Sequence, residues 1–232
     1  MPAALYGKTQ SKRDFVAPGA PRAFLDRWEP WMQAGLASSR LVLDRAWQER
    51  FLTAPIWRFW LGEAICGTTL AGAFMPSLDA IGRYYPLAVF SGGPAGLAIP
   101  PPELDLQESW FAALEDFLLA TLDPAMGWEQ IAAGLSALPD PQAAPPAQPA
   151  PGMTALAGGF AAPLDPAAPG EVFADLRRAD WGAHFAQRSF FWTSGGDGFR
   201  PAALASRGLP APEFFVGLLT GEFGAAGAAV LA

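Results

Sequence analysis

The strongest constraint on the fold of this chain is a stretch rich in proline and alanine that interrupts an otherwise patterned sequence. Residues 139–151 are nearly all Pro, Ala and Gln, and the Pro-rich character persists to Gly170. This composition cannot bury enough apolar surface to hold a fixed shape. We therefore predict a core in residues 1–138, a linker or insertion in residues 139–170, and a C-terminal segment in residues 171–232 that packs back on the same core. The sequence leaves open whether residues 139–170 separate two domains or decorate one.

The composition outside this stretch is that of a packed globular protein. Of the 232 residues, 51% are hydrophobic and only 16% are charged, which excludes overall disorder. Nine Trp and seventeen Phe supply large side chains for a core. A chain of this length can bury one sizeable core, alone or with a smaller appended unit.

The charge is unevenly distributed along the chain. The net charge is -7, yet residues 1–60 hold nine Lys or Arg against five Asp or Glu. The acidic whole argues against a nucleic-acid partner. The basic N-terminal part is either an ordinary solvated surface or one that faces an acidic partner.

Cysteine and histidine usage limits the chemistry that the chain can perform. Cys66 is the only cysteine and His184 the only histidine, so no intrachain disulfide can form and a zinc site is not expected. The single cysteine fits a reducing cytoplasm, and no apolar segment of signal-peptide type follows the first basic residues. We expect a cytoplasmic protein without stable membrane insertion. Phe214–Ala232 comes closest to a tail anchor, but its glycines favour a last core helix with a frayed tail.

The pattern of apolar residues predicts alternating helices and strands. Strands are expected at Ala4–Gly7, Ile56–Leu61, Thr68–Met75, Tyr84–Phe90 and Ser189–Thr193. Helices are expected from Pro21 with a kink or a break at Pro30, from Ser38 or Ser39 to Pro55, and at Leu104–Leu122, Trp128–Leu135, Glu171–Phe185 and Ala211–Leu219. This order favours the α/β class with mixed layers over a helical bundle or a β-sandwich.

The segment Met75–Leu87 is the most distinctive candidate site. Pro76 ends a strand, Ser77 and Asp79 can bond nearby backbone N–H groups, and Gly82 permits a positive φ. Arg83 lies four residues after Asp79, its nearest candidate partner. The segment is either an ion-paired turn that positions two strands or a site that grips a partner's carboxylate or phosphate through Arg83.

Two further basic residues are candidates for partner binding. Alternation along Ile56–Leu61 places Arg58 and Trp60 on one face of the strand, where Arg58 either stacks on a tryptophan ring or anchors a partner. Lys8 follows Gly7, but the full phosphate-loop spacing is absent. Lys8, Lys12 and Arg13 could form a basic docking loop.

Enzymatic activity is the weaker alternative. A hydrolase would depend on His184, with Cys66 or a serine as nucleophile, and a phosphoryl-handling enzyme would depend on Lys8. No G-x-S-x-G motif surrounds any serine. We expect no catalytic residue, metal or cofactor.

Several ordered blocks resemble the TagF (ImpM-like) family of type VI secretion-associated proteins. The blocks are Tyr6-Gly7-Lys8 with Asp14-Phe15-Val16, Trp31-Met32 with Ser39-Arg40, Pro55-Ile56-Trp57-Arg58-Phe59, Cys66-Gly67, Met75–Leu87, and Ser189-Phe190-Phe191-Trp192-Thr193. Their joint order from Tyr6 to about Leu219 is the specific signal. Arg13 stands where the family pattern has Gly, and Phe191 stands where a second Trp is common.

The resemblance implies an α/β/α sandwich with a mixed central sheet in the family's own topology. It also implies a bacterial, non-enzymatic post-translational repressor that acts on the assembly of the type VI secretion system. The partner implied is the forkhead-associated (Fha) scaffold protein of that system, and no small-molecule substrate is expected. The residues expected to bind the partner are Lys8, Arg58, Ser77, Asp79 and Arg83.

Overall fold

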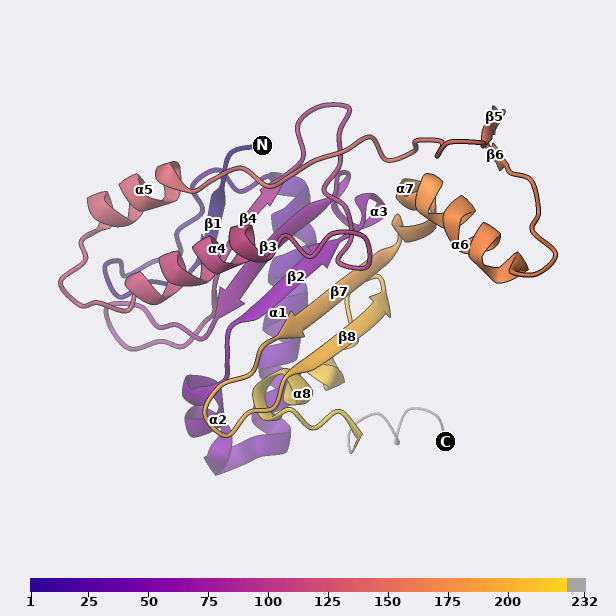
Figure 1. Cartoon of the computed structure of the whole chain (residues 1–232). Helices are drawn as coiled ribbons and strands as arrows, with labels where there is room; N and C mark the ends of the chain where they lie inside the picture. Colours follow the sequence, from indigo (N-terminus) through magenta and orange to yellow (C-terminus); the bar gives the residue numbers. More distant parts are fainter. Residues whose placement is uncertain (225–232) are drawn as a thin grey trace.

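The fold is built around one six-stranded sheet with helices on both faces (Figure 1). The computed structural model describes residues 1–224. The strand order is β1-β4-β3-β2-β7-β8, with the bounds β1 Ala4–Gly7, β2 Trp57–Leu61, β3 Leu70–Met75, β4 Leu87–Gly92, β7 Arg188–Thr193 and β8 Ala202–Arg207. The α/β class is confirmed. Every strand pair in this sheet is antiparallel, so the expectation of a mixed sheet is wrong.

For β3 and β4, the antiparallel pairing follows from a short connection. β3 and β4 are joined by a loop that reverses the chain, and their register runs from Leu70 opposite Gly92 to Met75 opposite Leu87. Parallel neighbours would need a long crossover, usually a helix, between consecutive strands.

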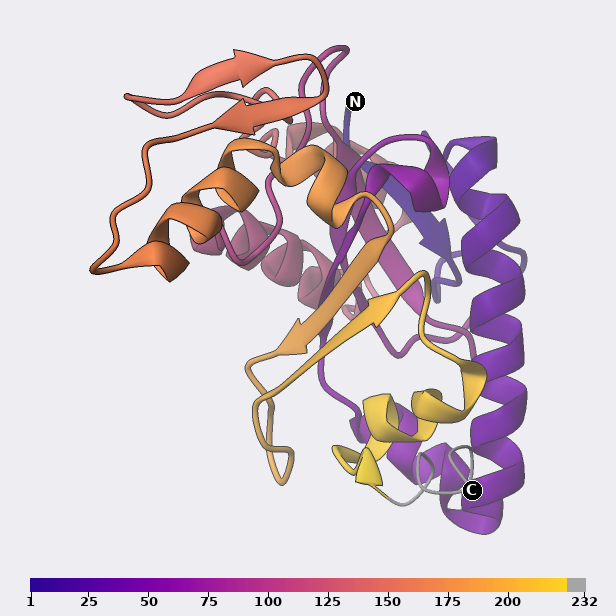
Figure 2. The ribbon, with the colours of Figure 1, turned by 90° about the vertical axis from the view of Figure 1, so that its right-hand side faces the viewer.

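One face of the sheet is covered by helices from both ends of the chain. These are α1 (Arg22–Leu43), α2 (Trp47–Thr53), which follows the 3-10 turn Asp44–Ala46, and α8 (Phe215–Thr220), which follows the 3-10 turn Pro212–Phe214. Figure 2 shows α1 running along this face. Phe24, Trp28 and Met32 on α1 pack with Trp57 and Phe59 from β2.

The opposite face is covered by α4 (Glu108–Ala120), α5 (Trp128–Ala137) and α7 (Trp181–Phe185), with α6 (Pro169–Ala179) preceding α7. Alternate strand residues point here, so Trp60 packs with Phe111 and Leu114, whereas its neighbours Trp57 and Phe59 face α1. The sheet therefore separates two apolar cores, as strand alternation predicts.

The helix starting after Pro21 continues past Pro30 as one helix to Leu43. Of the two alternatives at Pro30, the break into two helices is wrong, and the kink stays a prediction. Burial of its aromatic face offsets the cost of an internal proline. Ser39 caps no second helix: it lies buried inside α1, donates to the Leu36 carbonyl and accepts a bond from Trp47 Nε1 at 2.9 Å. The helix expected at Glu171–Phe185 is also broken, at Asp180, into α6 and α7.

The remaining differences concern the C-terminal third of the chain. β8 was not expected, because its small side chains (Ala202-Ala203-Leu204-Ala205-Ser206-Arg207) carry a weak strand signal. The Pro-rich stretch holds a small hairpin, β5 (Thr154–Leu156) with β6 (Gly159–Ala161). The Pro-rich stretch also bonds to the segment that follows it: the Gly182 N–H donates to the Pro146 carbonyl at 2.8 Å. The division at residues 138 and 170 stays a prediction.

Membrane insertion was considered for the C-terminal run. Within residues 1–224, no helix combines the length and the apolar character needed to cross a membrane. α8, which covers Phe215–Thr220, packs in the core beside α1. The last part of the predicted tail, residues 225–232, lies outside the described residues.

Candidate functional site

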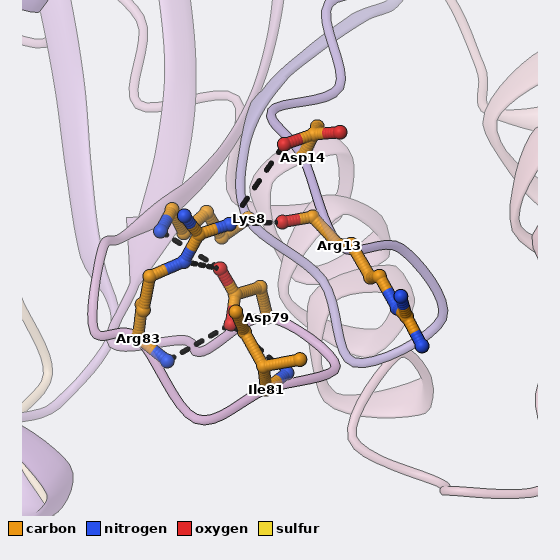
Figure 3. Close-up of polar contacts among 6 residues, drawn as sticks. All are labelled: Lys8, Arg13, Asp14, Asp79, Ile81 and Arg83. Carbon is orange, nitrogen blue, oxygen red and sulfur yellow. Dashed lines mark hydrogen bonds and ion pairs between the residues drawn. The ribbon is translucent and has the colours of Figure 1, made fainter.

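A buried carboxylate organises the loop between β3 and β4. Asp79 is 0% exposed and accepts four hydrogen bonds (Figure 3). Its Oδ2 accepts from Lys8 Nζ at 2.8 Å and from Arg83 Nε at 2.6 Å, and its Oδ1 accepts from the backbone N–H groups of Ile81 at 3.1 Å and Arg83 at 2.9 Å. The ion pair predicted between Asp79 and Arg83 is therefore present.

Individual residues of the segment set the path of this loop. Pro76 follows the last strand residue, and Ser77 accepts the Tyr85 N–H on its carbonyl at 3.0 Å. Gly82 has φ +83, a conformation that strains other residues, and its N–H donates to the Asp79 carbonyl at 2.9 Å. The chain thereby brings Arg83 back over Asp79.

A second loop, from the N-terminal part of the chain, meets the first. Paired backbone bonds between Gly7 and Val16 close residues 8–15 into a loop. Arg83 Nη2 donates to the Arg13 carbonyl, and the Ala80 N–H donates to the Lys12 carbonyl at 2.9 Å. Asp14 lies 3.8 Å from Arg83 Nη2. We call residues 8–15 together with residues 76–86 the loop pair.

The pKa of Asp79 reports how strongly the loop pair favours its ionised form. Burial opposes ionisation, but the hydrogen bonds from Lys8, from the backbone of Arg83 and Ile81 and from the Arg83 side chain outweigh it. The pKa of Asp79 therefore lies well below its ordinary value. Asp79 and Lys8 together form a buried, mutually neutralised pair.

Aromatic side chains support the N-terminal loop. Phe15 stacks on Tyr6 with ring centroids 5.8 Å apart and meets Tyr85 edge-on at 4.7 Å. The Lys8 ammonium lies 5.2 Å from the centre of the Phe15 ring. These contacts fix the side chain of Lys8 toward Asp79 rather than toward solvent.

Arg58, on β2, forms a second cluster that is separate from the loop pair. It is 3% exposed on β2 and contacts α4: its Nε donates to Glu115 Oε1 at 2.7 Å, its Nη2 to Glu115 Oε2 at 3.0 Å and its Nη1 to Glu108 Oε2 at 2.6 Å. The guanidinium stacks on Phe111, 5.3 Å from the ring centre, rather than on a tryptophan.

Arg58 and Glu108 stabilise each other's charged forms. Burial opposes the charge of the guanidinium, but the hydrogen bonds to Glu115 and Glu108 outweigh it and raise its pKa. The hydrogen bond from Arg58 lowers the pKa of Glu108 against a smaller opposing effect of burial. All three guanidinium nitrogens of Arg58 are engaged inside the fold.

The structure thus divides the five predicted residues. Lys8, Ser77, Asp79 and Arg83 share the loop pair, whereas Arg58 belongs to the contact between β2 and α4. Sequence reasoning missed both partners of Arg58. The available signal was the seven-residue spacing of Glu108 and Glu115, two turns of one helix face.

The two residues on which a hydrolase would depend, His184 and Cys66, lie in different surroundings. His184 is exposed, and among residues 1–224 its imidazole has no hydrogen bond to a serine, cysteine or carboxylate. Cys66 is buried, and burial raises the pKa of its thiol to about 11. The described residues hold no group of three or more His, Cys, Asp or Glu placed to bind a metal ion.

Comparison with known proteins decides the family. Residues 4–138 match the family described as "TagF N-terminal domain, Type VI secretion system-associated". The chain belongs to the TagF family. This TagF-family chain is also similar to the crystal structure of PA0076 from Pseudomonas aeruginosa PAO1, at 30% sequence identity and a TM-score of 0.76. The likeness covers 95% of this chain and 94% of that one. No curated protein matches the sequence.

Family membership also settles the broad role. A TagF-family chain belongs among the proteins associated with type VI secretion. Both the Asp79 loop and Arg58 lie within the matched residues, so the two arginine clusters are part of the TagF N-terminal domain.

Proposed function

We propose that this TagF-family chain is a cytoplasmic, non-enzymatic regulator that represses assembly of the type VI secretion system after translation, by binding the Fha scaffold protein. The observation that carries the proposal is the family match over residues 4–138. Repression and the Fha partner are what the resemblance implies for this family.

The state of the reactive groups supports a role without chemistry. The Lys8 amine is bound to a buried carboxylate, so it is not available to a phosphate. The Cys66 thiol is buried with a raised pKa, which leaves little thiolate near neutral pH. His184 has no hydrogen-bonded acid or nucleophile among the described residues.

Gene deletion tests the direction of the effect. Loss of a repressor raises secretion, whereas loss of a structural subunit abolishes it. The readout is the amount of a secreted component of the system in the medium of deletion and complemented strains. Reduced secretion after deletion would contradict the proposal.

Binding of purified Fha to the purified chain tests the partner. A pull-down with wild type and with Arg83→Ala measures whether the loop pair contributes. Arg178→Ala is the matched control, because Arg178 is an exposed arginine paired at 2.5 Å with Asp175 on α6. Wild-type protein that recovers no Fha overturns the partner.

A further inference from the structure

A pocket opens directly beside the loop pair. Its volume is about 300 Å³, and Gln10, Ser77 and Leu78 of the loop pair contribute to its lining. The other walls come from the segment between α2 and β2, from Met75 and from the end of α4. This size is at the lower end of ligand pockets, which suits one or two side chains of a partner better than a cofactor.

Apolar side chains surround the mouth of this pocket. Leu52, Leu119 and Leu122 line it and are exposed to solvent. Outside the pocket lining, on the loop pair itself, Ile81 is 60% exposed and Phe15 is 44% exposed. Single exposed apolar residues are ordinary, but several beside one pocket mark an interaction surface.

The loop pair is basic although the protein is acidic. It carries Lys8, Lys12, Arg13 and Arg83 against Asp14 and Asp79, in a chain with a net charge of -7. Because Lys8 and Asp79 neutralise each other in the interior, the charges that face solvent belong to Lys12, Arg13, Arg83 and Asp14.

Two of these cations have donors free to bind a partner. The Arg83 side chain is 52% exposed, and within residues 1–224 its Nη1 makes no hydrogen bond. The Arg13 side chain is exposed and has no hydrogen bond or ion pair within the same residues; only its carbonyl is used, by Arg83. The Arg13 guanidinium can bind a carboxylate with two parallel bonds, and the free Nη1 of Arg83 can add a further one.

We infer that the loop pair and its pocket form the docking surface for a short acidic segment of Fha. An apolar side chain of that segment enters the pocket beside Ser77, while its carboxylates meet Arg13 and Arg83. The choice of an acidic occupant rests on charge complementarity, and its identification as Fha rests on the proposed function.

The internal bonds of the loop pair serve this docking. Four hydrogen bonds to Asp79 and the bond from Ala80 to Lys12 hold both loops in place before a partner arrives. A surface ordered in advance loses less conformational entropy on binding. Lys8 and Asp79 are positioning residues, whereas Arg13, Ile81 and Arg83 make the contact.

The test is calorimetric titration of purified Fha into the purified full chain. Ile81→Asp and Arg13→Glu each place a negative charge on the surface. Neither removes a donor to Asp79, because residue 81 bonds to it through its backbone N–H and Arg13 does not bond to it. Each variant is expected to weaken binding about tenfold or more, the effect of losing a central interface contact. Raising the ionic strength is expected to weaken the wild type more than Arg13→Glu, since the variant has less attraction to screen.

Matched controls lie on α6. Phe173→Asp and Arg178→Glu change an exposed apolar residue and an exposed arginine in the same way. α6 lies beyond the opposite end of the sheet, because α7, which follows it, contacts Gly62 just after β2, whereas the loop pair is at the Met75 end of β3 (Figure 1). Both controls are expected to bind Fha like the wild type.

The outcomes separate the surface from the function. If the wild type binds Fha and Ile81→Asp and Arg13→Glu bind equally well, the docking surface is wrong and the regulatory function stands. If the wild type does not bind Fha, the partner is wrong and the inference falls with it. If the wild type is a dimer that Ile81→Asp dissociates, the occupant is a second copy of this chain, which also overturns the inference. Thermal melts establish that each variant is folded.

Discussion

The two arginine clusters solve the problem of an internal charge in opposite ways. At β2 the cation is buried and its acidic partners reach solvent: Arg58 is 4% exposed at the side chain, Glu115 24% and Glu108 67%. At the loop pair the anion is buried, at 0%, and one of its cations, Arg83, is 52% exposed. The first cluster fixes a helix to a sheet, and the second fixes two loops to each other.

The difference shows where function can reside. All three guanidinium nitrogens of Arg58 donate hydrogen bonds to α4, so none is left for a partner. Arg83 donates hydrogen bonds from Nε and Nη2 within the fold, and its Nη1 stays free. A fixed cation with a free edge is available to a partner, as we propose for Arg83, whereas a fully bonded one such as Arg58 stabilises the framework.

Removal of Asp79 is expected to be the most damaging change to either cluster. Asp79→Ala leaves the buried Lys8 ammonium uncompensated and strips two backbone N–H groups of their acceptor, so we expect a loss of about 3–5 kcal/mol in the free energy of unfolding. Chemical denaturation measures it. Asp79→Asn keeps an oxygen for the N–H groups and should lose less. Asp14→Ala, at a 96% exposed side chain, should change little; equal losses for Asp14 and Asp79 would contradict the buried-anion account.

Lowering the pH is expected to weaken the loop pair through protonation of Asp79. The pKa of Asp79 is depressed in the folded state, so its contribution to stability is complete above the ordinary carboxyl pKa, about 3.9, and is lost as the pH falls toward the folded pKa. The excess stability of the wild type over Asp79→Asn should therefore shrink below about pH 4. Parallel denaturation curves from pH 7 to pH 3 measure this. A difference independent of pH would mean that the charge of Asp79 contributes nothing.

Replacement of Arg58 is expected to cost less, because its partners can be hydrated. Arg58→Met keeps much of the buried aliphatic volume and loses hydrogen bonds to two charged groups, for which we expect a loss of about 1.5–3 kcal/mol. Binding of Fha should stay within about twofold of wild type, since Arg58 has no free donor. Denaturation and titration on the same sample measure both quantities. Lost binding with unchanged stability would make Arg58 a partner contact after all.

The sequence predicted the strands and the general fold class well, because both depend on local pattern. Strand alternation separated Trp57 and Phe59 from Arg58 and Trp60 correctly. It failed where tertiary packing overrode a local signal. Pro30 did not break α1, because the aromatic face of that helix is buried, and β8 was missed because its small side chains carry no strong pattern. The pairing direction of the sheet depends on connections that alternation does not encode.

The candidate site was predictable only where its partners are close in sequence. Asp79 and Arg83 are four residues apart, and the turn residues between them predicted their ion pair. Lys8 is 71 residues from Asp79, and Glu115 is 57 residues from Arg58. No spacing rule connects such pairs, since only the order of strands and the placement of α4 bring them together.

Arg83→Gln should have the smallest effect on stability and a clear effect on binding, which is the sharpest form of the comparison. Asp79 keeps Lys8 and both backbone N–H groups, and an ion pair at a half-exposed arginine is worth about 0–1 kcal/mol. Fha binding should fall several-fold, because the outward guanidinium edge is gone. Denaturation and titration, with Arg178→Gln as control, separate the two. A stability loss as large as that of Asp79→Ala would place Arg83 with Arg58 in the framework, and the loop pair would then have no exposed guanidinium of its own beyond Arg13.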